Sequence, residues 1–300
     1  MEHLFIINPA ADKGRAKNVA GWLRNELRER HSSQSATIIL TERAGQIIDI
    51  IRTKAAPDTV IIACGGDGTL HDIVNAAFPK QLAVGIIPAG SANDFVKTLY
   101  PPKWNSRALT RLFDGTTRRV DLALVTNPRS GTRCMVNSAG IGFTGRIADA
   151  VRRNHWLKGE TLYAAALFTT LHGYHPPRYG ITMTTPTGTI RLHEPLFALS
   201  IANGTTEGGK FRIAPGADPA DGLLDVILLG AIPRHRFPLY LRHYLAGTHI
   251  GKPDIRHYRV HSITIEPDQP DLMHIDGEVF TTGTAPVTFT AAPAALTIIG

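Results

Sequence analysis

The sequence predicts an α/β domain with a parallel sheet, followed by a β-sandwich domain. Three observations predict it: apolar runs that alternate with helical patterns up to Asp121, a buried strand that ends in a glycine turn, and short strand-like runs joined by Pro and Gly after Asp121. Alternating strands and helices with short connections are typical of parallel sheets. Short strands bounded by turn residues favour a sandwich.

The expected strands of the first domain are apolar runs, found at Leu4–Ile7, Ala36–Leu40, Val60–Cys64 and Leu82–Ile87. Helical patterns follow the first three runs, at Ala16–Arg30, Ala44–Lys54 and Leu70–Ala77. A linker at Pro101–Arg107 leads through a short helix to Gly115. Ligands of such sheets bind beyond the carboxyl ends of the strands. We therefore expect Asn8, Thr41 and the turn at Gly65 to share one edge.

The expected strands of the second domain are Val136–Ile141, Tyr179–Thr185, Thr187–Leu192, Leu196–Ala202, Leu223–Leu229, Val260–Glu266 and Ala285–Thr290. Two helical stretches interrupt them, Phe143–Leu171, with a charged break at Arg152–Glu160, and Arg234–Ala246. Both stretches carry clusters of Arg, His, Trp and Tyr. Such clusters form either solvated faces or membrane contacts, and the pattern leaves both interpretations open.

Length and composition favour two globular domains, because 300 residues exceed the usual size of one core. The two cysteines, Cys64 and Cys134, are too few for a disulfide framework or a cysteine metal site, so we expect a cytoplasmic, reducing setting. The start of the chain lacks the features of a signal peptide, and no run reaches the roughly 18 apolar residues of a membrane-spanning helix. We expect no transmembrane segment and, at most, peripheral attachment to a membrane.

The formal net charge of +7 suggests an anionic partner. Nucleotides, nucleic acids and acidic lipid headgroups all fit this charge, so the number alone does not choose among them.

The most informative stretch is Gly65-Gly66-Asp67-Gly68-Thr69, which follows the apolar run Val60–Cys64. Glycines let the backbone approach a ligand closely, and the N-terminus of the following helix attracts anions. The stretch therefore predicts a phosphate site. Because Asp67 would repel a phosphate, we interpret it as a Mg²⁺ partner or as the acceptor of a proton from an attacking hydroxyl. A tight turn with a local aspartate contact is the alternative.

Two further turns lie at the same expected edge. The first, Asn8–Arg15, has a basic rim in which Lys13 and Arg15 either contact phosphate or are solvated. The second, Pro88–Phe95, places Ser91 as a natural N-cap and adds a second acidic residue, Asp94.

Three acidic sites follow along the chain. Asp121 is a third carboxylate, and salt bridges with the adjacent Arg118 and Arg119 are its alternative interpretation. The turn Pro215–Leu223 has the composition in which a carboxylate and backbone carbonyls can surround a hard cation, and a plain loop is the alternative. In the segment Asp271–Glu278, the pair Asp276-Gly277 alone would indicate a hairpin turn.

Taken together, these motifs resemble the diacylglycerol kinase catalytic-domain family, which includes soluble bacterial lipid kinases and eukaryotic sphingosine and ceramide kinases. The resemblance covers nearly the whole chain. The motifs that carry it, in the family's order, are Asn8-Pro9 with Gly14, Gly65-Gly66-Asp67-Gly68-Thr69, Pro88 to Phe95, Gly208-Gly209, Ala217 with Asp221-Gly222, and Asp276-Gly277-Glu278. The motif at Gly65–Thr69 is shared with NAD kinases and is less specific. The Pro88 segment together with Asp276-Gly277-Glu278 is quite specific.

The resemblance implies a Rossmann-like nucleotide-binding domain over residues 1–122, to which residues 293–300 return, and a β-sandwich over 123–292 that binds the lipid substrate. It implies ATP bound by Asn8, Pro9, Ala10, Ala11, Asp12, Thr41, Gly65, Gly66, Asp67, Gly68, Thr69, Leu70, His71 and Ser91. It makes Glu278 the catalytic acidic residue and places Asp67, Asp94 and Asp121 around a catalytic Mg²⁺ that they contact through water. It also implies a structural Mg²⁺ held by the Asp221 carboxylate and the carbonyls of Asp218 and Leu223. Two departures stand out: Ser91 replaces the usual Thr, and His71 replaces a common Asn.

The resemblance thus implies an ATP- and Mg²⁺-dependent lipid kinase of phospholipid biosynthesis that acts at the membrane surface on a diacylglycerol-like or sphingoid lipid. Phosphoryl transfer needs positioning, a metal ion and a carboxylate that takes the hydroxyl proton, and either Glu278 or Asp67 could be that carboxylate. The sequence has no P-loop and no protein-kinase catalytic loop. Rival interpretations are an NAD kinase and a non-catalytic nucleotide-binding protein. Scattered carboxylates and the lack of a basic tract argue against nucleic acid, and exposed sheet edges leave a homodimer open.

Overall fold

The computed structural model describes residues 2–14, 16–31, 34–43, 45–100, 107–128, 131–153 and 159–300. Arg15, the linker before Arg107 and part of the break between Arg152 and Glu160 lie outside the described residues. The contacts divide the chain into two units, Met1–Leu122 with Pro293–Gly300, and Ala123–Ala292. Binding of nucleotide by the first and of lipid by the second stay predictions.

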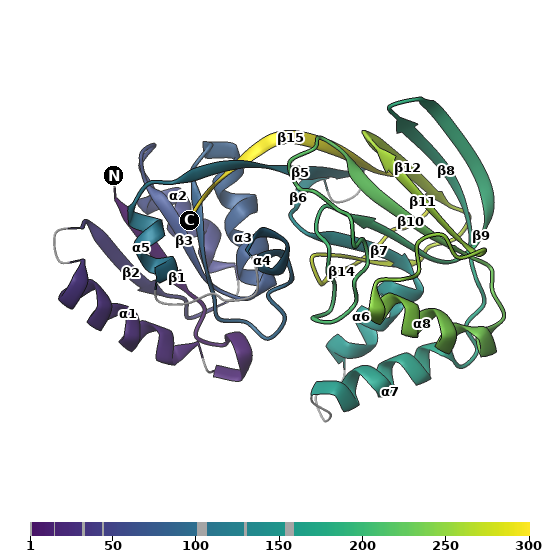
Figure 1. Cartoon of the computed structure of the whole chain (residues 1–300), viewed down its shortest axis with the longest axis horizontal. Helices are drawn as coiled ribbons and strands as arrows, with labels where there is room; N and C mark the ends of the chain where they lie inside the picture. The colour runs from purple at the N-terminus through teal and green to yellow at the C-terminus, as the bar shows by residue number, and fades with distance from the viewer. Residues whose placement is uncertain are drawn as a thin grey trace. The chain divides into compact units, whose positions relative to one another are not determined.

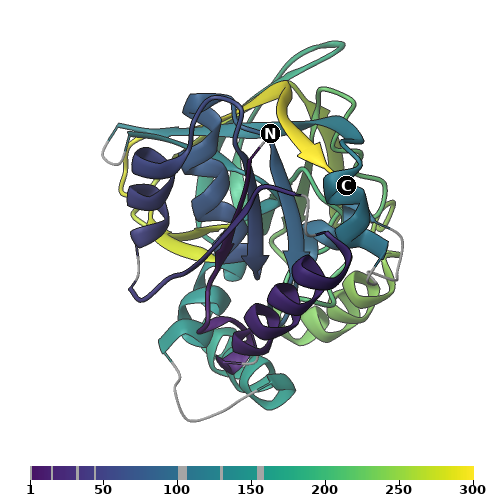
Figure 2. The ribbon, with the colours of Figure 1, turned by 90° about the vertical axis from the view of Figure 1, so that its left-hand side faces the viewer.

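The first unit contains a parallel sheet in the order β4-β3-β1-β2, and Figure 2 shows its strands between helices on either side. Its strands are β1 (His3–Ile7), β2 (Ala36–Leu40), β3 (Val60–Gly65) and β4 (Val84–Pro88). Every residue of β1 and β3 is buried, as near-continuous apolar runs in parallel sheets require. The end of β15 (Val287–Ile299) adds a parallel neighbour to β4, with Ile298 opposite Val84. The predicted α/β class is therefore confirmed.

The helices of this unit are α1 (Lys17–Arg30), α2 (Gln46–Lys54), α3 (Asp67–Ala77), α4 (Asp94–Leu99) and α5 (Arg107–Phe113), with 3₁₀ turns η1 (Ala11–Gly14) and η2 (Phe78–Lys80). Helix α2 buries Ile47, Ile50 and Ile51, one face of a helical repeat. Side chains of α1, α5 and the strands form one core, which includes Phe5, Leu23, Ile62 and Leu112.

Two local predictions in this unit were wrong. Helix α3 begins at Asp67 and not at Leu70, so Asp67, Gly68 and Thr69 form its first turn. Helix α4 is preceded by Asn93 as N-cap residue, and not by Ser91. Asn93 adopts a left-handed conformation, which Asn tolerates, and its amide bonds both the N–H and the carbonyl of Gly90. These two bonds close the turn before the helix starts.

The second unit is a sandwich of antiparallel strands, as predicted (Figure 1). Its strands are the end of β5 (Thr117–Asn127), β6 (Gly131–Met135), β7 (Ser138–Gly142), β8 (Arg178–Thr185), β9 (Gly188–Ala202), β10 (Leu224–Gly230), β11 (Ile255–Val260), β12 (Ser262–Pro267), β13 (Leu272–Ile275), β14 (Glu278–Thr281) and the start of β15. The first half of β9 pairs with β8, and its second half pairs with β7 and β10. Side chains from both sheets, such as Ile181, Ile201 and Ile275, form the core between them.

The strands of this unit differ from the sequence prediction in several places, and β6, β13 and β14 were not predicted as strands. The predicted strands Thr187–Leu192 and Leu196–Ala202 are one strand, β9, that continues through Pro195. Pro195 is tolerated because it lies opposite Arg178, where β9 leaves β8 and joins the other sheet. Strand β15 likewise runs without interruption through Pro293. Strand β11 was missed because its exposed positions are charged or polar.

Three helices, α6 (Phe143–Arg153), α7 (Gly159–Leu171) and α8 (Phe237–Ala246), pack on a second apolar cluster, with the 3₁₀ turn η3 (Arg234–Arg236) before α8. The cluster is aromatic at its centre, where Phe143, Phe197 and Phe237 have ring centroids 4.6 to 4.9 Å apart. Within the described ranges, none of the helices has the length and apolar composition needed to cross a membrane.

Candidate functional site

The strand ends of the first unit bring several of the predicted ATP-binding residues to one edge. Asn8 follows β1, Thr41 follows β2, and the turn at Gly65-Gly66 follows β3. The side-chain nitrogen of Asn8 donates to the hydroxyl of Thr69 over 3.3 Å, and the side-chain oxygen Oδ1 of Asn8 accepts the N–H of Ala10. The predicted convergence within this unit is therefore present.

A second link joins the two turns beside that edge. The hydroxyl of Ser91 donates to the Asp12 carboxylate over 2.8 Å. Asp12 itself has a positive φ of 46°. Sequence reasoning placed both residues near ATP but could not foresee that they bond each other, since they lie far apart in the chain.

Glycine is required at two positions of the turns, Gly65 and Gly90. A Cβ at Gly65 would lie 2.4 Å from the Thr69 hydroxyl oxygen, and a Cβ at Gly90 would lie 2.2 Å from the Cα of Gly66. The two turns therefore touch backbone to backbone. The first amides of α3, which have no carbonyl partner within the helix, begin directly after Gly66 and suit an anion.

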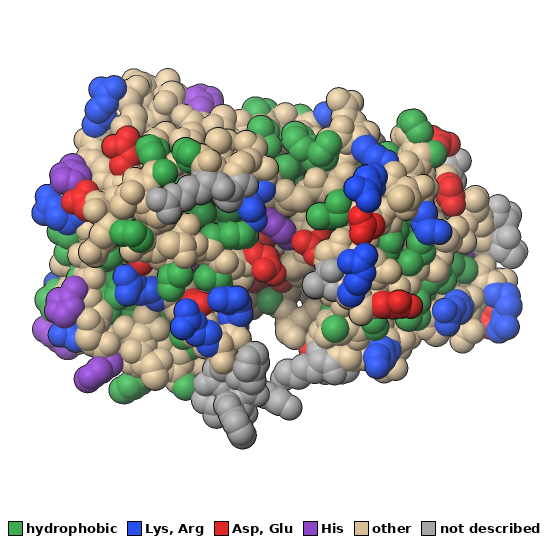
Figure 3. Space-filling view, turned by 180° about the vertical axis from the view of Figure 1, so that it is seen from behind, with side chains coloured by type: hydrophobic (Ala, Val, Ile, Leu, Met, Phe, Trp, Pro, Cys, Tyr) green, Lys and Arg blue, Asp and Glu red, His purple; other side chains and the backbone are tan. Residues whose placement is uncertain are grey.

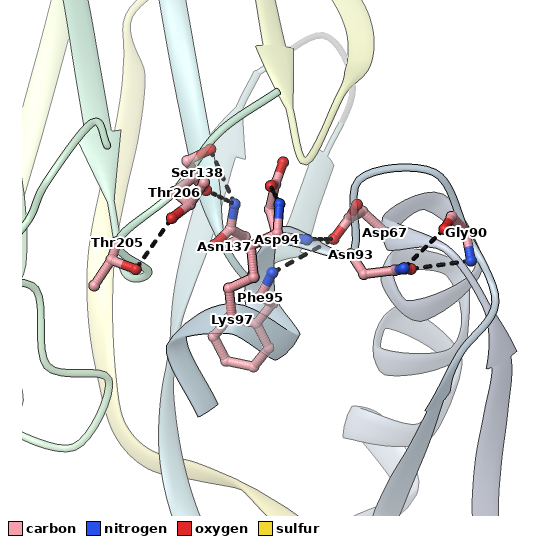
Figure 4. Close-up of polar contacts among 10 residues, drawn as sticks. All are labelled: Asp67, Gly90, Asn93, Asp94, Phe95, Lys97, Asn137, Ser138, Thr205 and Thr206. Carbon is pink, nitrogen blue, oxygen red and sulfur yellow. Dashed lines mark hydrogen bonds and ion pairs between the residues drawn. The ribbon is translucent and has the colours of Figure 1, made fainter. Parts of the chain in front are cut away.

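Asp67 has a structural partner within the same unit. Its Oδ1 accepts the N–H of Asp94 over 2.7 Å and that of Phe95 over 3.5 Å (Figure 4). A carboxylate at a helix N-terminus satisfies free amides and the helix dipole. This bonding accounts for an aspartate at position 67, and a role in binding Mg²⁺ stays a prediction.

The other two predicted aspartates of this unit are buried and bonded. Asp94 forms an ion pair with Lys97 over 3.0 Å (Figure 4). Asp121 accepts the N–H of Ala294 over 2.6 Å, while Arg119 donates to the carbonyl of Ala294. Asp121 and Arg119 thus hold the returning end of β15. Their roles around a metal ion stay predictions.

Leu70 and His71 belong to the buried face of α3. The His71 ring lies 3.4 Å from the amide nitrogen of Asn75, which also donates to the carbonyl of His71. The side chains of Leu70 and His71 are therefore engaged in packing. If these residues contact ATP, they do so through their backbone N–H groups. A small cavity beside this helix is lined by Ala63, Gly65, Gly66, Asp67, Leu70, Ile86, Asn93 and Val96.

In the second unit, Asp276 and Gly277 form the turn of the hairpin β13–β14. Both have positive φ, 51° and 88°, and Ile275 pairs with Glu278 across the turn. The Asp276 carboxylate accepts the N–H groups of Val136, Asn137 and Ser138 over 2.8 to 3.1 Å. Asp276 thus anchors the hairpin to β7, and Glu278 follows with an exposed side chain.

The sequence analysis did not identify a buried ion pair beside this hairpin. Nε2 of His274 lies 3.3 Å from Oε1 of Glu207, and the hydroxyl of Ser138 donates to the other Glu207 oxygen over 2.9 Å. Burial is the largest single effect on the pKa of His274 and would lower it, but the charge and hydrogen bond of Glu207, together with the charge of Asp276, outweigh burial and raise that pKa. Burial would raise the pKa of Glu207, but His274 and Ser138 hold it below its usual value. The His274 ring lies across Gly140, where a Cβ would be 2.6 Å from Nε2.

The turn at Asp218–Leu223 contains the types of oxygen that a hard cation binds. The Asp221 carboxylate accepts the N–H of Leu223 over 2.9 Å and contacts the guanidinium of Arg259, and the Asp218 carbonyl accepts the N–H of Asp221 over 3.4 Å. One carboxylate with neighbouring carbonyls fits Mg²⁺ in kind, but the ion would share this carboxylate with Arg259. In the part of the chain that the structure describes, His, Cys, Asp and Glu form no cluster of three or more suited to a metal.

The predicted site residues thus belong to two groups. Asp67, Asp94 and Asp121 lie in the first unit, and Asp221 and Glu278 lie in the second. Convergence of both groups on one metal-bound triphosphate stays a prediction.

Comparison with known proteins assigns a family to each part of the chain. Residues 2–125 match the family described as diacylglycerol kinase catalytic domain. Residues 137–300 match the family described as YegS C-terminal NAD kinase beta sandwich-like domain.

Relatives match along most of the chain. A protein of Pseudomonas fluorescens named probable lipid kinase YegS-like is 32% identical over 288 residues, which cover 94% of this chain and 87% of the relative. A diacylglycerol kinase of Mycobacterium tuberculosis is 24% identical over 296 residues, covering 98% and 93%. The crystal structure of a diacylglycerol kinase from Bacillus anthracis has a TM-score of 0.68 at 21% identity, covers 99% of this chain and 96% of its own, and shares the fold.

Proposed function

This chain belongs to the diacylglycerol kinase catalytic-domain family, and from that premise we propose that it transfers the γ-phosphate of ATP to the hydroxyl of a diacylglycerol-like or sphingoid lipid. The observation that best supports the proposal is the contact of the Gly66 and Gly90 backbones beside the first amides of α3. Backbone surfaces without side chains next to a helix N-terminus suit the phosphates of a nucleotide.

The donor side of the reaction belongs to the first unit. The amides at the start of α3 would bind phosphate oxygens, while Asn8, Thr41 and the pair Asp12–Ser91 would surround the rest of the nucleotide. Mg²⁺, held by Asp67, Asp94 and Asp121 through water, would neutralise charge on the β- and γ-phosphate oxygens.

The proton acceptor is Glu278 in this proposal. The lipid hydroxyl oxygen forms a bond to the γ-phosphorus, the bond from that phosphorus to the bridging oxygen breaks, and ADP leaves. The hydroxyl proton passes to the carboxylate. Glu278 is exposed at the end of a hairpin, whereas Oδ1 of Asp67 already accepts two N–H groups and is for that reason a poorer proton acceptor.

The acceptor lipid would be met at the cytoplasmic surface of a membrane, in phospholipid biosynthesis. Nucleic acid is not part of the proposal, because Lys and Arg side chains are interspersed with Asp and Glu on the face shown in Figure 3. We also propose that an edge strand such as β11 or β14 could pair two copies into a homodimer, which a measurement of molecular mass in solution tests.

In the decisive experiment, the protein is incubated with labelled ATP, Mg²⁺ and mixed micelles that contain diacylglycerol, sphingosine, ceramide or no acceptor lipid. A parallel reaction contains NAD in place of the micelles, and the transfer of labelled phosphate to each acceptor is measured. The proposal expects label in one lipid and none in NAD. Label in NAD that is indifferent to micelles would identify an NAD kinase instead. Tight ATP binding without transfer to any acceptor would identify a non-catalytic nucleotide-binding protein.

A further inference from the structure

The segment Arg234–Ile250, which contains η3 and α8, is basic and contains no acidic residue. Its arginines are Arg234, Arg236 and Arg242, and all three have exposed side chains. Arg236 lies 3.6 Å from Asp254, so part of its charge is compensated. Among the described residues, no ion pair involves Arg234 or Arg242. Two positive charges on this segment are therefore available to an external anion.

Helix α8 is apolar on two sides. Its inner side buries Phe237, Tyr240 and Tyr244 in the aromatic cluster. Its outer side carries Leu239, which is 53% exposed, and Leu245, which is 44% exposed, with Arg242 between them. Residues three apart on a helix lie on the same side, so two leucines and an arginine share one outward face. An outward pair of leucines is not needed for the packing of the unit.

Helix α7 adds further apolar surface next to the same cluster. Its described side chains, Thr161 to Leu171, include no charged residue, and only Ala166 among them is buried. Leu167 and Leu171 pack on the aromatic cluster that also holds α8, whereas Phe168 is 78% exposed. Phe168 is thus a large apolar side chain that the aromatic cluster leaves uncovered.

Apolar side chains interleaved with arginines fit the interface of an anionic bilayer. Leucine and phenylalanine enter the boundary of the acyl chains, while arginine stems lie along it and their guanidinium groups meet phosphate headgroups. A second copy of this chain is a poorer occupant. In a symmetric dimer the same patch would face itself, so Arg242 would approach its own equivalent.

We propose that the outer face of α8, formed by Leu239, Arg242 and Leu245, together with Phe168 of α7, docks the protein on an anionic phospholipid bilayer. The inference deepens the proposed function and rests on it in one respect, since a kinase of membrane lipids must meet its acceptor at a bilayer. The surface belongs to a single unit and includes none of the predicted catalytic or nucleotide-binding residues.

The test measures sedimentation of the full chain with vesicles, without ATP or diacylglycerol. Vesicles of phosphatidylcholine alone are compared with vesicles that contain about one-third phosphatidylglycerol. Binding is expected to the anionic vesicles and to weaken with salt. The double variant L239Q/L245Q and the variant F168S are each expected to bind about tenfold more weakly. R242Q is expected to lose about fivefold on anionic vesicles.

Matched controls separate this surface from general stickiness. I48Q removes a similarly exposed apolar side chain from α2, and R191Q removes an exposed arginine from β9; both are expected to bind as the unaltered protein does. Circular dichroism and melting temperature verify that each variant folds. Equal binding by all folded variants would overturn the proposal, and so would a concentration-dependent dimer that L239Q/L245Q abolishes while vesicle binding persists.

The vesicle result and the kinase result are independent. Vesicle binding that depends on Leu239 and Leu245 in a protein that phosphorylates no lipid would support the docking surface and overturn the proposed function. If the protein phosphorylates a lipid in micelles but its vesicle binding does not depend on Leu239 and Leu245, the proposed function would be supported and the docking surface overturned.

Discussion

Gly66 and Gly90 touch through their backbones, because a Cβ on Gly90 would lie 2.2 Å from the Cα of Gly66. One residue ends the turn after β3 and the other lies in the turn after β4. Their contact is what lets two neighbouring strands bring their turns together at the edge where we expect phosphate to bind.

The variant G90A tests this contact. The added methyl group meets backbone, which cannot rotate away, so we expect a loss of about 1–3 kcal/mol in the free energy of unfolding. We also expect at least tenfold weaker ATP binding, measured by calorimetry. The control is G21A in α1, where no atom lies within 4 Å of the added Cβ. G21A should be neutral or stabilising by up to about 1 kcal/mol. Unchanged ATP affinity in G90A would contradict the role given to the contact.

Replacement of Asp67 distinguishes its structural role from a metal role. D67A removes the acceptor of the N–H groups of Asp94 and Phe95, and should cost about 1 kcal/mol of stability. D67N keeps an oxygen acceptor and should cost less. If Asp67 also holds Mg²⁺, the phosphoryl-transfer rate of D67N should fall at least tenfold at saturating Mg²⁺. If D67N is stable and fully active, Asp67 does not hold Mg²⁺, and its role is to cap the N-terminus of α4.

The variant E278Q tests the proton acceptor. Glu278 is exposed at the end of the hairpin, so its replacement should leave the melting temperature unchanged. Loss of a general base should lower kcat by about 10²–10⁴ with little change in KM for ATP. E266Q, which alters an exposed glutamate of β12 in the same unit, serves as control. Turnover of E278Q at the rate of E266Q would show that another group accepts the proton.

The ion pair of His274 and Glu207 predicts a pH dependence of stability. The folded pKa of His274 is raised, so its contribution is complete below the unfolded pKa near 6.5 and is lost as pH rises through the folded pKa. The folded pKa of Glu207 is lowered, so its contribution is complete above the unfolded pKa near 4.5 and is lost as pH falls through the folded pKa. The pair should therefore stabilise most between about pH 4.5 and 6.5.

Urea unfolding at pH 5.5 and pH 8.5 measures this dependence in the unaltered protein and in the double variant E207Q/H274Q. The stability difference between the two proteins should be larger at pH 5.5, by an amount on the order of 1 kcal/mol. A comparison of proteins is needed because burial lowers the pKa of His249 to about 4, which opposes stability as pH falls below 6.5 in both. A difference that is equal at the two pH values would refute the pair's contribution.

The sequence predicted what local patterns encode and missed what distant residues do together. Apolar runs and glycine turns located β1 to β4 because each signal lies within a few residues. The bond of Asp67 to the start of α4, and the bond of Asp12 to Ser91, join segments that only the folded sheet brings together. The pair Glu207–His274 escaped notice for the same reason, since the two residues lie far apart in the sequence and only the fold brings them together. Strand β9 was divided at Pro195 because its crossing between sheets cannot be read from one segment.

Addition and removal of Mg²⁺ test whether the turn at Asp221 binds this cation. Without nucleotide, we expect Mg²⁺ to raise the melting temperature of the unaltered protein only slightly, because Arg259 already neutralises the Asp221 carboxylate. In R259Q the carboxylate loses this partner, so Mg²⁺ should raise the melting temperature by several degrees and EDTA should reverse the rise. D221N is the control and should not respond to Mg²⁺. If Mg²⁺ raises the melting temperatures of R259Q and D221N by the same amount, the cation binds elsewhere. The assignment of Asp221, Asp218 and Leu223 as its ligands is then wrong.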